Sequence, residues 1–179
     1  EDHDFRVQPS TFTPHLAESW EWSDDHKTLT LHLRKGVVWS DGVPMTAEDV
    51  RWTWQAHMNP AVAWESVYMK EHIRDVEVVD PHTVRFHFTR VYAKQLLDVN
   101  EGLILPKHLW SKLPFEKWRD NPDWFRQHMV AAGPFKIASW TPQQELVLAR
   151  NEKYWQKDRP YLDRVVIRVV PDPSTAPQG

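Results

Sequence analysis

The sequence predicts an α+β protein with a mixed, mainly antiparallel β-sheet and flanking helices. Short segments in which apolar and polar residues alternate occur in pairs joined by turn residues, and a segment of helical period separates the first two pairs. The chain has 179 residues and 41% hydrophobic content, enough to bury a core. We therefore expect one domain or one large lobe.

The first strand pair is a β-hairpin. Residues 17–23 alternate, with Trp20 and Trp22 on one side, and residues 24–27 form a polar turn that leads into alternating residues 28–33. The same pattern predicts five later strands, at residues 73–79, 83–89, 135–140, 146–148 and 165–169. Pro171 and Pro173 are expected to end the last one.

One helix is predicted clearly, between the first two hairpins. Thr46 and Asp49 have the spacing of a capping box, and Asn59-Pro60 stops the segment. Its apolar face carries Val50, Trp54 and His57. Weaker helical patterns cover residues 93–99, 107–113 and 123–128.

Composition excludes several classes of function. The net charge is −3, with 22 basic and 25 acidic residues and no basic stripe, so we expect no nucleic-acid partner. No apolar run reaches the roughly 20 residues that span a bilayer. The absence of cysteine excludes disulfides, thiolate catalysis and cysteine-ligated zinc, but it does not indicate a compartment.

A series of motifs runs along almost the whole chain. The first is Pro14-His15-Leu16-Ala17-Glu18-Ser19-Trp20, which continues through Ser23-Asp24-Asp25 and residues 28–37. Further motifs follow in order: Trp39-Ser40-Asp41-Gly42, residues 45–50, residues 76–84, Gly133-Pro134-Phe135-Lys136, residues 151–155, residues 160–163 and Pro171-Asp172. Together they resemble the extracellular solute-binding proteins of family 5, the oligopeptide, dipeptide and nickel class.

The resemblance implies part of the N-terminal lobe of a two-lobed, class II-like periplasmic-binding-protein fold, which closes over a solute about a hinge. Residues 1–128 would form the peripheral subdomain of that lobe, and residues 129–179 would begin its central subdomain. Because family members are much longer, we expect the sequence to be a fragment from which the second lobe is absent.

The resemblance also implies a function. The protein would be the substrate-binding component of an ABC importer, without enzymatic activity or cofactor. It would capture an oligopeptide or dipeptide in the periplasm or outside the cell and deliver it to the permease subunits, and the full-length protein could carry a lipid anchor. The alternatives are an oligosaccharide- or nickel-binding relative, an enzyme built on this lobe, and a ligand-sensing or interaction module.

The sequence has 11 tryptophans, an unusually high number, and the position of each one indicates whether it packs in the core or contacts a ligand. Trp20, Trp22, Trp52 and Trp54 lie in periodic segments, which favours packing in the core. Trp64 follows the helix stop in a segment without a period, and in peptide-binding relatives an aromatic residue in such a segment faces the ligand cleft. We therefore predict ligand contacts at Trp64 and, second, at Tyr68, and an aromatic wall would suit a broad binder.

Metal and catalytic sites are not expected. The ten histidines include no His-Glu-x-x-His and no pair at the short spacing that places two ligands on one face. Glycine-rich phosphate loops and the Gly-x-Ser-x-Gly motif are also absent. The acidic pairs lie at a predicted turn and a predicted helix N-terminus, where structural roles explain them.

Overall fold

The structure, a computed structural model, describes residues 12–169. The motif residues Pro171, Asp172 and Pro173 lie outside the described residues. The chain divides into two compact units. Residues 12–35 and Thr46–Pro122 make the first unit, and Gly36–Met45 and residues 123–169 make the second. The assignment of residues 1–128 and 129–179 to two subdomains of a larger lobe stays a prediction.

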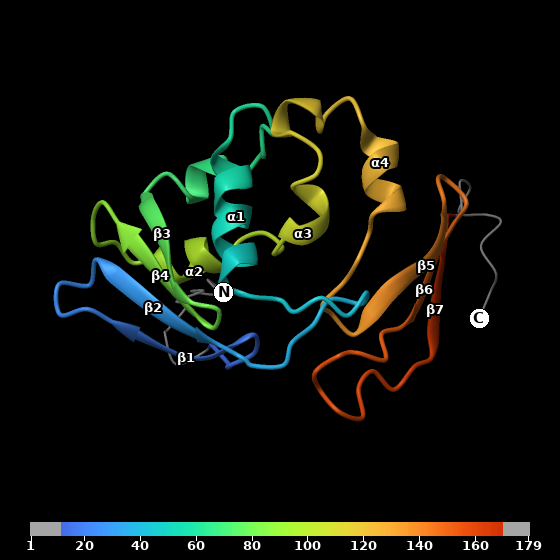
Figure 1. Cartoon of the computed structure of the whole chain (residues 1–179), viewed down its shortest axis with the longest axis horizontal. Helices are drawn as coiled ribbons and strands as arrows, with labels where there is room; N and C mark the ends of the chain where they lie inside the picture. The colour runs from blue at the N-terminus through green and yellow to red at the C-terminus, as the bar shows by residue number, and fades with distance from the viewer. Residues whose placement is uncertain (1–11, 170–179) are drawn as a thin grey trace, which may run out of the picture. The chain divides into compact units, whose positions relative to one another are not determined.

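The first unit contains a four-stranded antiparallel sheet (Figure 1). Its strands are β1 (Ala17–Trp22), β2 (Thr28–Leu33), β3 (Ile73–Asp80) and β4 (Thr83–Phe88), in the order β1-β2-β4-β3. Both predicted hairpins are confirmed, β1 with β2 and β3 with β4. The pairing of β2 with β4 joins them and places Leu29 opposite Phe86.

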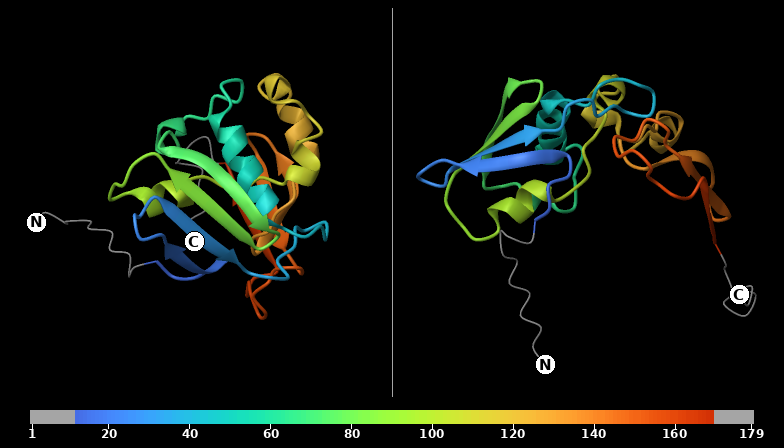
Figure 2. Two further views of the ribbon diagram at one scale, coloured as in Figure 1. Left: turned by 60° about the vertical axis from the view of Figure 1, so that its left-hand side comes forward. Right: turned by 90° about the horizontal axis from the view of Figure 1, so that it is seen from below.

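The core of the first unit lies between this sheet and two helices. The helix α1 (Ala47–Met58) contacts β3 and β4 (Figure 2), and residues of α2 (Gln95–Asn100) also pack against the core. Its buried members are Leu29, Leu33, Ala47, Ile73, Val76, Val84, Phe86 and Phe88. Burying a side chain as large as leucine or phenylalanine contributes about 1.5–3 kcal/mol, so this cluster stabilises the unit.

The four tryptophans that were assigned to packing do pack. Trp20, Trp22 and Trp54 lie against the core cluster. Trp52 is buried on a different side of α1, where its ring lies 5.6 Å from that of Phe115 and 5.8 Å from that of Trp118. The weaker helices are present but short, as α2, α3 (Lys107–Trp110) and α4 (Pro122–Gln127), with 3₁₀ turns at Val67–Met69 and Phe115–Lys117.

The second unit contains a separate three-stranded antiparallel sheet. Its strands β5 (Phe135–Thr141), β6 (Glu145–Arg150) and β7 (Arg164–Arg168) pair in that order. Asn151 joins its loops, because Nδ2 donates to the carbonyl oxygens of Ala131 at 3.3 Å and Gly133 at 2.8 Å. Ser40 also donates its main-chain N–H to Ala131 at 2.9 Å. Three of the sequence motifs, around Ser40, Gly133 and Asn151, therefore hold each other in place.

Candidate functional site

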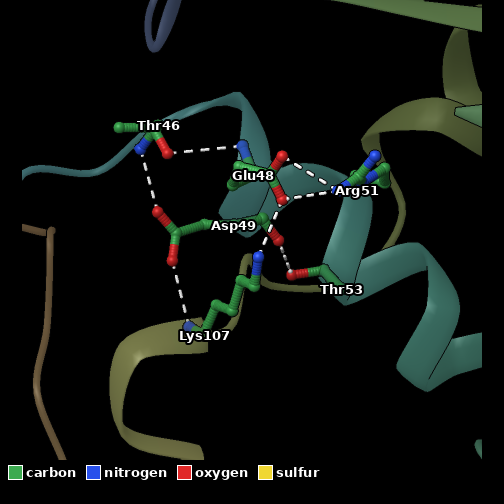
Figure 3. A network of polar contacts seen from close by, with 6 residues as sticks. All are labelled: Thr46, Glu48, Asp49, Arg51, Thr53 and Lys107. Atoms are coloured by element: carbon green, nitrogen blue, oxygen red, sulfur yellow. Dashed lines mark hydrogen bonds and ion pairs between the residues drawn. The ribbon is translucent and has the colours of Figure 1, made fainter. Parts of the chain in front are cut away.

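Hydrogen bonds of side chains fix the N-terminus of α1 (Figure 3). Thr46 is the N-cap, and its hydroxyl accepts a hydrogen bond from the main-chain N–H of Glu48 at 3.3 Å. The carboxylate of Asp49 accepts in return from the main-chain N–H of Thr46 at 2.8 Å. This confirms the capping box, which is worth about 0.5–2 kcal/mol to the helix.

The first two turns of α1 also bind a loop that is distant in sequence. The N–H of Lys107 donates to Asp49 at 3.0 Å, and the N–H of Leu105 donates to the hydroxyl of Thr53 at 2.8 Å. The ammonium group of Lys107 lies 2.8 Å from a carboxylate oxygen of Glu48, and its hydrogen bond lowers the pKa of that carboxyl group (Figure 3). Residues 105–107 are therefore tied to α1.

At its other end, α1 presents a histidine to Trp64. The rings of His57 and Trp64 are stacked, with centroids 3.9 Å apart and planes inclined by 12°. The His57 side chain is 6% exposed, and Trp64 is half-buried. Burial, assisted by the nearby charge of Lys70, lowers the pKa of His57 to about 4. The imidazole is therefore neutral at pH 7, and it serves as a flat packing surface for the indole.

Lys70 lies close to the same tryptophan. It is 4% exposed, with its Nζ atom 5.8 Å from the centroid of the Trp64 ring. The ammonium group donates to the main-chain oxygens of Asp98, of Val99 at 3.2 Å and of Glu101 at 2.8 Å. Burial lowers the pKa of Lys70 to about 8, although the charges of Asp98 and Glu101 act in the opposite direction.

Gly102 completes the surroundings of Trp64. Its φ of +85° lies in the region that favours glycine. A Cβ atom there would lie 2.7 Å from Cε1 of His57 and 3.2 Å from Cζ2 of Trp64. A side chain at this position would therefore clash with His57 and lie tightly against Trp64. We call His57, Trp64, Lys70 and Gly102 the Trp64 cluster.

The predicted site residues have different surroundings. Trp64 contacts His57 at the end of α1, Lys70 just after the 3₁₀ turn and Gly102 after α2, whereas Tyr68, in the 3₁₀ turn, is 62% exposed. Leu103, next to Gly102, is 82% exposed. Ligand contact by Trp64 and Tyr68 stays a prediction. The arrangement offers aromatic and apolar contact surface, and within residues 12–169 no group of three or more His, Cys, Asp or Glu side chains could hold a metal ion.

Sequence reasoning missed Lys70 and Gly102 and assigned His57 only to the apolar helix face. Gly102 could have been noticed as one of only five glycines, in a segment where no turn was predicted. Lys70 gave no signal, because a single lysine in a polar segment is most often solvated. Among the described residues, no helix is long and apolar enough to cross a membrane.

Residues 11–178 match the family of bacterial extracellular solute-binding proteins, family 5 Middle. The dipeptide-binding protein DppE of Bacillus subtilis is 28% identical over 173 residues, which cover 90% of this chain and 32% of that protein. The chain spans about a third of the length of the curated relatives it matches.

Two solved structures are similar over most of the chain. NikZ of Campylobacter jejuni in complex with Ni(L-His) has a TM-score of 0.76 and 29% identity, over 90% of this chain and 31% of that one. The oligopeptide-binding protein AppA of Bacillus subtilis in complex with a nonapeptide has a TM-score of 0.77 and 31% identity, over 88% of this chain and 31% of that one. With a family match across nearly all of its residues and the same fold as these proteins, the chain belongs to the bacterial extracellular solute-binding proteins of family 5.

Proposed function

We propose that the protein containing this chain is the solute-binding component of an ABC importer and captures an oligopeptide or dipeptide in the periplasm or outside the cell. The observation that carries the proposal is the family match over residues 11–178. A dipeptide-binding protein and a nonapeptide-binding structure among the relatives support the peptide. Permease subunits of the membrane would be its partners, and it would act by binding rather than by catalysis.

Within this chain, the Trp64 cluster is our candidate contact surface. The indole is half-buried and is supported by the His57 ring at 3.9 Å, so it would lose little freedom when a ligand packs against it. An aromatic face tolerates varied side chains, which suits a protein that accepts peptides of different sequence. The exposed ring of Tyr68 would add a second, more mobile contact.

A second candidate solute is a nickel complex, because the likeness to NikZ is as strong as the likeness to AppA. Within the described residues the chain offers no group of three or more metal-ligating side chains. The solute would then be a nickel chelate such as the Ni(L-His) bound by NikZ, and this part of the protein would contact the chelator.

A thermal-shift screen of the complete protein tests both candidates. The probes are alanine peptides of two to five residues, a raffinose control, nickel chloride and nickel with excess histidine. We expect a rise in melting temperature with one or more peptides, because a ligand that binds only the folded state stabilises it. If nickel with histidine is the only probe that stabilises the protein, the solute is the nickel chelate rather than a peptide.

The screen also separates binding from turnover. Each stabilising peptide is incubated with the protein and analysed by chromatography, and we expect it to be recovered intact. Recovery of cleavage products at a rate that scales with protein concentration would contradict the proposal. So would the absence of stabilisation by any probe.

A further inference from the structure

Lys70 is a buried charge within the Trp64 cluster, and the proposed function assigns it no contact with the solute. Removing an ammonium group from water is costly unless hydrogen bonds replace the lost solvation. Here the replacements are main-chain oxygens: those of Asp98 and Val99 in the last turns of α2, and that of Glu101, which follows it. The last four carbonyl groups of a helix have no partner within the helix, so Lys70 supplies donors that α2 itself lacks.

The hydrogen bond from Lys70 to Glu101 restrains the residue that follows Glu101. Gly102 comes next in the chain, where an added Cβ atom would lie 2.7 Å from Cε1 of His57 and 3.2 Å from Cζ2 of Trp64. Further along, Leu105 and Lys107 are bonded to α1. The loop of residues 102–104 is thus held at both ends, by Lys70 on one side and by α1 on the other.

We propose that Lys70 is a positioning residue for Trp64: its ammonium group holds the end of α2 so that Gly102 is pressed against the stacked His57 and Trp64 rings. Three N–H donors for three oxygens make the protonated form the one that fits. A neutral amine has two donors, so one carbonyl group would lose its partner and the other bonds would lose their charge assistance.

The charged and titratable groups around Lys70 come from each neighbouring segment. They are His57 on α1, Asp98 on α2 and Glu101 after it, with Tyr92 bonded to Asp98 at 2.8 Å. Burial and the hydrogen bond to Asp98 raise the pKa of Tyr92, and His57 titrates at about 4. Burial lowers the pKa of Lys70 to about 8, so its charge changes as the pH passes from 7 to 9.

The test follows Lys70, Gly102 and Trp64 by NMR in the complete protein. Lysine is labelled with ¹³C at Cε, glycine with ¹⁵N and tryptophan with fluorine, and the signals are assigned with Lys70→Arg, Gly102→Ala and Trp64→Phe. As the pH is raised from 7 to 10, we expect the Gly102 and Trp64 signals to shift with the midpoint of Lys70. The Gly133 amide in the other unit is the reference and should not follow that midpoint.

A variant removes the charge at constant pH. At pH 7, Lys70→Met should shift the Gly102 and Trp64 signals, and the pH-dependent shift should be lost. Lys94→Met is the matched control, because Lys94 is exposed and precedes the same helix. In Lys94→Met, the Gly102 and Trp64 signals should match those of the unaltered protein.

The proposal is overturned if the Gly102 and Trp64 signals stay unchanged while Lys70 loses its proton, at whatever pH that occurs. Unchanged signals in a folded Lys70→Met variant would also overturn it. If that variant fails to fold, the titration of the unaltered protein decides alone. Any effect on solute affinity rests on the proposed function, whereas these signals need no ligand, so the two proposals can fail separately.

Discussion

Substitution of Gly102 by alanine tests the close contact in the Trp64 cluster. Two costs are expected. A non-glycine residue at a φ of +85° loses about 1 kcal/mol. The added Cβ, 2.7 Å from a carbon of the buried His57 ring, forces that ring or the loop to move, and such overpacking costs about 1–3 kcal/mol. We expect Gly102→Ala to destabilise the first unit by about 2–4 kcal/mol.

Gly36→Ala is the matched control, because Gly36 also has a positive φ, +76°, but an added Cβ would meet no atom within 4 Å. It should cost only the conformational term, about 1 kcal/mol. Hydrogen exchange at increasing urea concentration measures the stability of each unit separately. Peptides from α1 report on Gly102→Ala, and peptides from β6 report on Gly36→Ala. Equal losses in the two variants would refute the role of the contact.

Three further predictions concern the same residues and the whole chain. Trp64→Ala should weaken solute binding by the complete protein by about 1–3 kcal/mol, measured by calorimetry, and an unaltered dissociation constant would assign Trp64 to packing alone. His57 has an ordinary pKa of 6.5 and a folded pKa of about 4, so the unfolded chain binds a proton that the folded chain excludes as the pH falls between these values. As the pH falls through this range, the free energy of unfolding should therefore drop by up to about 3 kcal/mol more in the unaltered protein than in His57→Phe. Denaturation experiments at several pH values measure it, and the same pH dependence in both proteins would contradict the prediction. The isolated 179-residue chain should show a cooperative melt by circular dichroism. It should nevertheless bind solute far more weakly than the complete protein, because a cleft between two lobes buries most of its ligand. Equal affinity of the two proteins by calorimetry would overturn this.

The sequence by itself determined the local elements and the family. Alternation along Thr28–Leu33 and Thr83–Phe88 identified strands, because the side chains of a strand face opposite sides in turn. Thr46 and Asp49 identified the start of α1, because a capping box needs only residues three positions apart. The motifs identified the family because their order along the chain is itself sequence information.

Only the tertiary structure decided which distant segments meet. The strands form two sheets rather than one, and residues Gly36–Met45 belong to the second unit, although they lie between two segments of the first. Periodicity does not specify which strands pair, because alternating strands present similar hydrogen-bonding edges.

The surroundings of Trp64 depend on tertiary structure in the same way. The sequence singled out the tryptophan from its position after a helix stop, but Lys70 and Gly102 have no local pattern that would mark them. Their roles arise from contacts across about 30 residues or more, where a lysine reaches the end of α2 and a glycine meets two rings. A buried charge and a close backbone contact are properties of packed surroundings, and those exist only once the chain has folded.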